Sequence, residues 1–478
     1  MHAEPVGTPT SVDDHPLLSR RYKVWLVAVL LVVSTFNFAD RAILAVLAQP
    51  IKEDLKLTDT DLGLLQGLGF AILYSILGIP LGWLAERVSR KGLIAACVAV
   101  WSFMTAICGF ATSFFTLLLA RVGVGVGEAG FMPATSSLVP DHFRAERRAS
   151  ATSVILLGSP LGLLLGQAVG GWVAAEWNWR VAFFALGIPG ILSALLVWFT
   201  LREPPRGLAE GHVVTTDPPP IAAVMAHLWS TPALRHLLIG WTVANFSMNA
   251  VAHFVLPFYL RGFGLPLAVV GAVFGLVAST SNGIGMLVGG FGFDRLSRRD
   301  PRWPLWGPAA GLVLAVPIYL GAFSSTHAWT SMAFIWFANL VLISYLAPTL
   351  ATAQNLVGAR MRAVVIALFF VFSGLLGAGL GPTVLGMASD FLASQAFGAG
   401  DFIASCPGGR APVDAGETAD AACRAASTEG LRLALMTVQI FFVWAAVHYV
   451  LAARTLKRDL YRPPESRIRS GDEGSSPA

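Results

Sequence analysis

Long apolar runs, separated by short polar segments, are the dominant pattern along the chain. A run of about 20 apolar residues is what a helix needs to cross the hydrocarbon of a bilayer. These runs are continuous, unlike the ten-residue alternation typical of a transmembrane barrel. We therefore predict twelve transmembrane helices. They cover residues 24–46, 62–84, 92–111, 114–136, 150–173, 180–201, 234–258, 267–290, 303–323, 327–350, 362–389 and 430–455.

The runs fall into two groups of six, so the predicted fold class is an all-α membrane protein built from two six-helix bundles. A segment with three consecutive prolines lies between the groups and is expected to be a linker. The ends of the chain are polar and are expected to be disordered. The predicted division is a tail at 1–19, a bundle at 20–201, a linker at 202–233, a bundle at 234–460 with an outer loop at 391–429, and a tail at 461–478.

Composition supports a membrane protein. Hydrophobic residues make up 55% of the 478 and charged residues only 13%, and the mean hydropathy is +0.66. A soluble chain has about 25% charged residues. Most of the 33 Lys and Arg residues fall in segments on one side of the predicted helices, and that side is expected to be cytoplasmic. Both termini are then expected to lie in the cytoplasm, and the chain is expected to lie in the inner membrane. The basic net charge of +5 reflects this bias and predicts no nucleic-acid partner.

Four cysteines fall in two groups. Cys97 and Cys108 lie within a predicted helix and are expected to be packing residues. Cys406 and Cys423 lie in the predicted outer loop, where an oxidising compartment would permit a disulfide. Sequence cannot supply the geometry that a disulfide requires, so this pairing stays open. No metal-ligand spacing appears, and we predict neither a metal nor a cofactor.

An internal repeat links the two halves. The loop after the second run reads GWLAERVSRK (82–91), and the loop after the eighth reads GFGFDRLSRR (290–299). Such a match at corresponding places indicates duplication, although ordinary positive-inside loops would also be basic.

With this repeat the chain resembles the major facilitator superfamily, whose members carry a G-x-L-x-D-R-x-G-R-R loop after the second and eighth helices. Ser89 and Ser297 replace the usual glycine here, and Glu86 replaces the first acid. The resemblance implies the major facilitator fold and alternating access, with the loops stabilising the outward-facing form. The gating residues implied in this way are Gly82, Glu86, Arg87, Arg90, Asp294, Arg295 and Arg298.

The fourth run contains RVGVGVGEAG (121–130), which has the G-x-G-x-x-G spacing of a dinucleotide-binding turn. Such a turn needs a strand before it and a soluble βαβ unit, and neither is present. On a helix, Gly123 and Gly127 instead form a seam for close packing. Arg121 and Glu128 share the other face. An ionised side chain facing lipid costs roughly 2.5–3.5 kcal/mol or more, so this face is expected to line a polar cavity.

The first run supplies a matching set of polar residues. Asn37, Asp40 and Arg41 share one helical face, and with Arg121 and Glu128 they contribute two acids and two bases. We predict that Arg121 forms an ion pair with Asp40 or Glu128. Burial and a neighbouring arginine act in opposite directions on the protonation of an acid, so Asp40 and Glu128 are candidates for proton coupling. A static ion pair that holds two helices together is the alternative.

In the seventh run, Asn245, Asn249 and His253 recur every four residues and form one stripe on a helix. The stripe either lines a cavity or makes hydrogen bonds between helices. With Asn37, Arg41 and Arg121, these residues are the candidate substrate-binding set.

The motifs NFADR, RVGVGVGEA and WNWRVAF together resemble the Spinster branch of the superfamily, in a bacterial-type member. That resemblance implies proton-coupled transport of an amphipathic lipid with an anionic or zwitterionic head, such as a lysophospholipid or a molecule like sphingosine-1-phosphate. A small organic anion, such as a hexuronate, and a uniport mechanism remain alternatives. The expected partners are the solute, protons and the bilayer, with the chain as a monomer. A channel or receptor would not explain the duplicated loops, and no nucleophile–base pair indicates an enzyme.

Overall fold

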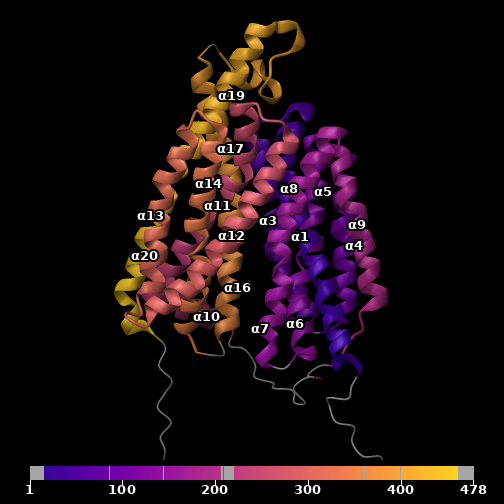
Figure 1. Cartoon of the computed structure of the whole chain (residues 1–478), viewed down its shortest axis with the longest axis vertical. Coiled ribbons are helices and arrows are strands. Elements are labelled where there is room, and N and C mark those ends of the chain that lie inside the picture. The colour runs from indigo at the N-terminus through magenta and orange to yellow at the C-terminus, as the bar shows by residue number, and fades with distance from the viewer. Residues whose placement is uncertain are drawn as a thin grey trace, which may run out of the picture.

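The computed structural model describes residues 16–85, 87–143, 145–205, 208, 220–358, 361–398 and 400–460. Within these residues, twelve helical spans are long and apolar enough to cross a membrane, which confirms the predicted fold class. The spans stand side by side as a bundle, with the first helices and the last helices on opposite sides (Figure 1).

The first six spans form the N half, and the last six form the C half. The N half contains α1 (Arg20–Leu55), α2 (Asp59–Gln66), α3 (Leu68–Ala85), α4 (Arg90–Cys108), α5 (Phe114–Glu128), α6 (Phe131–His142), α7 (Ala145–Leu156), α8 (Gly158–Glu176) and α9 (Trp179–Thr200). After α10 (Ile221–Ser230), the C half contains α11 (Pro232–Phe263), α12 (Leu267–Ser297), α13 (Trp303–Ser324), α14 (Ala328–Ile343), α15 (Leu346–Asn355), α16 (Arg362–Phe372), the π-helix η4 (Ser373–Gly379), α17 (Leu380–Phe397), α18 (Phe402–Ser405), η5 (Pro407–Gly409), η6 (Val413–Ala415), α19 (Glu417–Thr437) and α20 (Ile440–Asp459).

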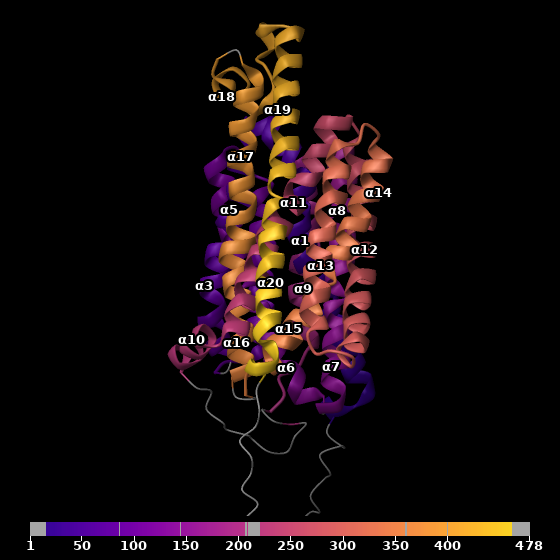
Figure 2. The same ribbon diagram turned by 90° about the vertical axis from the view of Figure 1, so that its left-hand side faces the viewer.

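The two ends of the bundle differ. The start of α1 and the end of α20 lie at one end, called here the terminal end. At the opposite end, α17 and α19 extend beyond the other helices and carry α18 between them (Figure 2). Residues 400–423, which include α18, η5 and η6, are called the cap, and this end is the cap end.

The halves meet most extensively where α8 packs on α12 and α2 packs on α17, and further contacts join α1 to α11 and α3 to η4. Glycines permit these approaches: an added Cβ at Gly271 would lie 2.3 Å from the Gln167 carbonyl oxygen, and one at Gly63 would lie 2.4 Å from that of Pro382. Toward the terminal end, by contrast, an added Cβ at Gly78 or Gly283 would meet nothing within 4 Å. The halves are therefore packed together at the cap end.

The predicted glycine seam of the fourth span is confirmed. An added Cβ at Gly127 would lie 2.5 Å from the Trp101 amide nitrogen, and one at Gly123 would lie 2.7 Å from Met104. Both contacts hold α5 against α4, so the glycines serve helix packing. The predicted span is broken into α5 and α6 after Glu128.

The predicted linker and the predicted outer loop both contain helices. Helix α10 lies inside the predicted linker 202–233, and it buries Val224 and Leu228 against the C half. Most of the predicted outer loop 391–429 is also helical, because α17 continues to Phe397 and α19 begins at Glu417. The hydrophobic pattern marks only the part of a helix that lies within lipid. It therefore did not show that α17 and α19 continue into the predicted loop. Residues 1–15 and 461–478, predicted as tails, lie outside the described residues.

Candidate functional site

The four ionisable residues singled out in the sequence come together inside the N half and are called the central cluster. Asp40 and Arg41 lie on α1, and Arg121 and Glu128 lie on α5. Asp40, Arg121 and Glu128 are 3%, 2% and 1% exposed. The Arg41 side chain is 31% exposed. The cluster therefore lies away from lipid, as the cost of a charge in hydrocarbon requires.

One ion pair crosses from α1 to α5 within this cluster. Nε of Arg41 donates to a carboxylate oxygen of Glu128 at 2.6 Å. The guanidinium also lies over the rings of Tyr74 and Phe70 on α3, at 4.6 and 5.0 Å from their centroids. A cation over an aromatic face is attracted to it, so these rings hold Arg41 in place beside Glu128.

The prediction that Arg121 pairs with Asp40 or Glu128 is wrong. No ion pair of Arg121 occurs among the described residues, and Glu128 pairs with Arg41 instead. Nε and Nη1 of Arg121 are buried without a hydrogen-bond partner in the described part of the chain, as are Asp40 Oδ1 and Glu128 Oε1. Arg121 still lies close enough to both acids to interact with them electrostatically.

Asp40 and Arg41 do not share one face as predicted: Arg41 reaches α3 and α5, whereas Asp40 reaches α4. Thr105 on α4 donates a hydrogen bond to its Oδ2. A cavity of about 10 Å³ borders Asp40 and Ser102 between α1, α4 and α9. That volume is about enough for one water. This side of Asp40 therefore has room for a water or a proton.

The stripe on α11 makes mostly local hydrogen bonds. The Asn249 amide donates to the Asn245 carbonyl oxygen at 2.9 Å, and His253 Nδ1 lies 2.8 Å from that of Asn249. Asn245 also donates to the Tyr345 hydroxyl at 3.0 Å, which ties α11 to the segment before α15. The alternative of hydrogen bonding between helices thus accounts for Asn245. His253 lies close enough to Arg121 of the N half for an electrostatic interaction.

The loop motif of the N half is anchored within that half. Arg90 is 2% exposed, forms ion pairs with Asp141 on α6 and Glu203 after α9, and donates to the Pro204 carbonyl oxygen at 2.8 Å. Arg87 is exposed and lies over the Trp83 ring. Glu86 and the side chain of Asp294 lie outside what the structure describes, while Arg295 and Arg298 are exposed at the terminal end. The gating role of the motif stays a prediction.

The pKa of Glu203 is lower than that of an ordinary glutamate. Partial burial raises its pKa, but hydrogen bonds from the Lys91 amide, Arg90 and the Ser89 hydroxyl outweigh burial and hold the pKa below its usual value. Hydrogen bonds to the charged form of an acid favour that form. The loop therefore binds Glu203 as a carboxylate.

Sequence reasoning missed a second charged group at the cap end. This cap-end cluster consists of Lys52 on α1, Asp59 on α2, Arg261 on α11 and Asp390 on α17. Lys52 Nζ lies 2.7 Å from Asp59 Oδ1. Arg261 holds both oxygens of the same carboxylate, with Nη1 at 2.8 Å from Oδ2 and Nη2 at 2.7 Å from Oδ1.

Asp390 completes this cluster from the other side of the interface. Its Oδ1 accepts the Asp59 amide at 3.0 Å, and its Oδ2 accepts the Thr60 amide and hydroxyl, both at 2.7 Å. One signal was available: Arg261 is the only Lys or Arg between Arg235 and Arg295.

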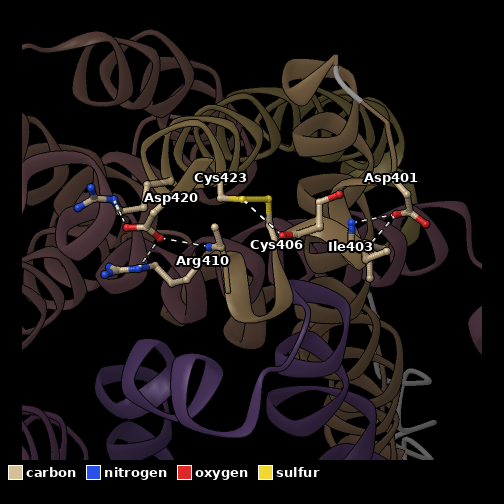
Figure 3. Close-up of a disulfide and its surroundings, with 10 residues drawn as sticks. Asp401, Ile403, Cys406, Arg410, Asp420 and Cys423 are labelled. Atoms are coloured by element: carbon tan, nitrogen blue, oxygen red, sulfur yellow. Dashed lines mark hydrogen bonds and ion pairs between the residues drawn. A yellow bond between two sulfur atoms is a disulfide. The ribbon is translucent and has the colours of Figure 1, made fainter. Parts of the chain in front are cut away.

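The cap lies against this cluster. A disulfide joins Cys406 to Cys423, and Asp420 bridges Arg410 and Arg424 beside it (Figure 3). Gly408 has φ +72°, a conformation that suits glycine, and an added Cβ there would lie 2.9 Å from the Lys52 carbonyl oxygen. The cap thus rests directly on the helix that carries Lys52.

Two helical halves packed together at one end, with charged residues buried within one half, are typical of multi-pass membrane transporters. A family model described as Major Facilitator Superfamily matches residues 30–382. An MFS-type efflux pump of Mycolicibacterium smegmatis is 33% identical over 79% of this chain and 87% of its own length. Protein spinster homolog 1 of Xenopus tropicalis is 28% identical over 78% of this chain and 74% of its own length.

A solved structure agrees with these relatives. A bacterial homolog of the human lysosomal transporter Spinster, in an inward-facing and unoccupied conformation, superposes with a TM-score of 0.83 at 30% identity, over 93% of this chain and 100% of that one. The chain therefore belongs to the Major Facilitator Superfamily and, within it, to the Spinster type.

Proposed function

We propose that this chain is a proton-coupled transporter that moves an amphipathic solute with an anionic or zwitterionic head by alternating access. A lysophospholipid or a molecule like sphingosine-1-phosphate has this chemistry. We further propose that the chain is a monomer in the inner membrane with both termini in the cytoplasm, that it is not an enzyme, and that it has no nucleic-acid partner. The terminal end is then cytoplasmic and the cap end is outside.

One observation carries the proposal: Arg121 is 2% exposed, and two of its nitrogens have no hydrogen-bond partner among the described residues. A buried donor that has no hydrogen-bond partner costs about 1–3 kcal/mol, and more on a charged group. A binding site can carry such a cost, because the bound ligand then satisfies the donors. The free donors of Arg121 suit the oxygens of a phosphate or carboxylate, which arginine binds in a bidentate manner.

The acids suit proton exchange. Asp40 has one buried oxygen without a partner among the described residues and adjoins a cavity with room for about one water. Binding a proton there removes a buried charge and supplies a donor. Glu128 also has one unpartnered oxygen in the described region, and it interacts electrostatically with both arginines. An anion that binds Arg121 would change the balance of charge around both acids.

The surroundings of Arg41 favour an amphipathic solute over a small organic anion. Three rings, those of Phe38, Phe70 and Tyr74, lie within 6 Å of its guanidinium. An apolar wall beside the head-group site suits a molecule that also carries a tail. Asn37 is buried next to Glu128, and Asn249 and His253 on α11 are partly exposed, which supports them as further candidate contacts. The efflux pump among the relatives favours export.

Reconstitution in liposomes tests this function. The internal pH would be followed with a dye while a lysophospholipid or glucuronate is added, with glucuronate representing the small-anion alternative. Proton flux is expected with the lysophospholipid. Asp40→Asn and Glu128→Gln should abolish the flux, and Arg121→Gln should abolish solute movement.

Asp401→Asn provides a matched control, because this exposed carboxylate lies in the cap, far from the central cluster in the fold. It should transport at the wild-type rate. Solute movement without proton flux in the wild type would show a uniporter. Transport of glucuronate alone would favour the small-anion alternative, and normal coupling in both acid variants would show that the acids are structural.

A further inference from the structure

The small cavity beside Asp40 is bordered by buried oxygen atoms that have no partner. It lies between α1, α4 and α9 and has a volume of about 10 Å³. Asp40 and Ser102 border it and are 3% and 2% exposed, and each has a side-chain oxygen without a hydrogen-bond partner among the described residues. Buried polar atoms are normally paired, so two unpaired oxygens beside one cavity indicate a bound water or ion.

Hydrogen-bond donors are scarce around this cavity. The Thr105 hydroxyl, which also borders it, lies within hydrogen-bond distance of Asp40 Oδ2 and, at 2.9 Å, of the Trp101 carbonyl oxygen. A hydroxyl has a single proton to donate, so it can serve only one of these two acceptors at a time. With a cation in the cavity, the hydroxyl could donate to Trp101 and present its lone pairs to the cation. The excess of acceptors therefore suits a positively charged ligand.

The charge at the cavity suits a monovalent cation. Asp40 is the only charged residue that the structure describes at its border, and Phe36, Trp101 and Leu186 make much of the remaining wall apolar. A low-dielectric wall strengthens the attraction between a cation and the carboxylate. One carboxylate balances one positive charge, whereas a divalent ion would leave a second charge buried without compensation.

Two glycines of α9 keep this space open. Gly187 and Gly190 both border the cavity. An added Cβ at Gly190 would lie 2.3 Å from Ser102 Oγ, and one at Gly187 would lie 2.8 Å from the Ser102 carbonyl oxygen. A side chain at either position would therefore displace Ser102 or fill the cavity. The volume of about 10 Å³ is at the lower limit for a water, so Na⁺, which is smaller than a water, fits better than K⁺.

The charge balance of the central cluster connects this cavity to the solute. Arg121 lies close enough to Asp40 to interact with it electrostatically. An anion bound at Arg121 would neutralise that arginine and leave the buried Asp40 carboxylate without compensation. A buried charge needs a partner. A cation beside Asp40 and an anion at Arg121 therefore favour the binding of each other.

We propose that the cavity beside Asp40 binds one sodium ion, with Asp40, Ser102 and Thr105 as its oxygen ligands, and that this ion competes with the proton for Asp40. The proposal deepens the proposed function, because it assigns a second coupling ion to Asp40, and its link to the solute rests on the anion site at Arg121. The sodium site itself requires only the residues around the cavity.

Binding of radioactive Na⁺ to the purified full-length protein in detergent tests this site. Scintillation proximity would measure it without any solute, with N-methylglucamine keeping the ionic strength constant. The wild type should bind Na⁺ saturably at about pH 8, and acidification to about pH 5 should weaken binding about tenfold or more, because the proton competes for the carboxylate. Asp40→Asn should abolish binding, and Ser102→Ala should weaken it at least about tenfold. K⁺ should displace bound Na⁺ less readily than Na⁺ itself does.

Ser34→Ala is the matched control for Ser102→Ala. Ser34 on α1 is also buried, and its hydroxyl also lacks a partner among the described residues, but it does not border the cavity. This variant should bind Na⁺ like the wild type.

Two results would overturn the sodium site. One is the absence of saturable Na⁺ binding to the wild type at about pH 8, which would leave a water as the occupant. The other is unaltered binding in Asp40→Asn and Ser102→Ala, in protein that elutes and melts like the parent. Displacement by K⁺ as readily as by Na⁺ would overturn the choice of ion. Because no solute is present, failure here would leave the anion site at Arg121 and its transport test standing.

Discussion

The central cluster and the cap-end cluster each contain two acids and two bases, yet they are built in opposite ways. In the cap-end cluster Asp59 has four donors on its two side-chain oxygens, and the contacts join the two halves. In the central cluster Arg41 and Glu128 form the single ion pair among the described residues, and unpartnered atoms remain on the other charged groups. The contrast agrees with a structural contact between the halves at the cap end and with the ligand-binding role that we propose for the central cluster.

The largest effect that separates the clusters is expected from Asp59→Asn. Lys52 would keep its charge at 2% exposure without its carboxylate. Breaking one member of a buried pair costs about 3–5 kcal/mol, so the free energy of unfolding should fall by that amount. The melting temperature in detergent measures it. Asp61→Asn is the matched control, since its acid only caps its own helix and should cost about 1 kcal/mol. Equal losses of unfolding free energy in the two variants would contradict a special role of Asp59.

Removing the disulfide comes next in size. Cys406→Ser with Cys423→Ser opens a loop of 17 residues, for which closure is worth about 3 kcal/mol. Hydrogen exchange in residues 400–423 should accelerate accordingly, while exchange in α4 and α5 stays as in the wild type. Cys97→Ala controls for loss of a cysteine outside the cap. Unchanged exchange in the cap would show that its helices hold it without the bond.

Glu128→Gln should reduce transport about 100-fold, which corresponds to about 2.7 kcal/mol. Arg41 would lose its carboxylate and become free to occupy the anion site beside Arg121. The melting temperature should change little, because the Arg41 side chain is partly exposed. Initial rates in liposomes measure the loss. Glu429→Gln, which removes a surface pair with Arg432, should transport normally. A collapse in stability equal to that of Asp59→Asn would contradict a ligand-binding role.

The smallest effect is expected at Glu203. This residue belongs to neither cluster, so its contribution to the pH dependence of stability can be separated from theirs. Its pKa is lowered in the folded protein, so its contribution to stability is present above the ordinary glutamate pKa and is lost as the pH falls through the folded pKa. Glu203→Gln should remove this acid-dependent loss, which is less than about 1 kcal/mol for a partly exposed pair. Melting from pH 6 to pH 3 measures it. An unchanged pH profile would mean that Glu203 is not the titrating group.

The hydrophobic pattern was sufficient to predict the twelve spans and their division into two halves, because a bilayer imposes the same length on every helix. It was insufficient wherever a helix continued beyond lipid, as α17 and α19 do on either side of the cap. Helix α10 was missed for a related reason: its ten residues are too few to signal a span, and it is held by burial of Val224 and Leu228 against the C half.

The candidate site shows the same limit. Asp40, Arg41, Arg121 and Glu128 could be selected because ionisable residues within apolar runs are costly and rare. The sequence could not show which acid pairs with which base. That depends on Phe70 and Tyr74 of a third helix, which hold Arg41 against Glu128.

By itself, the sequence determined which segments are apolar and long enough to cross a membrane, and which charged residues have to avoid lipid. Both follow from the cost of placing a polar group in hydrocarbon, which a single segment already reveals. The tertiary structure alone decided which charges are satisfied. That depends on donors and acceptors brought from distant helices to within 3 Å, as when Asp390 reaches the start of α2 from 330 residues away.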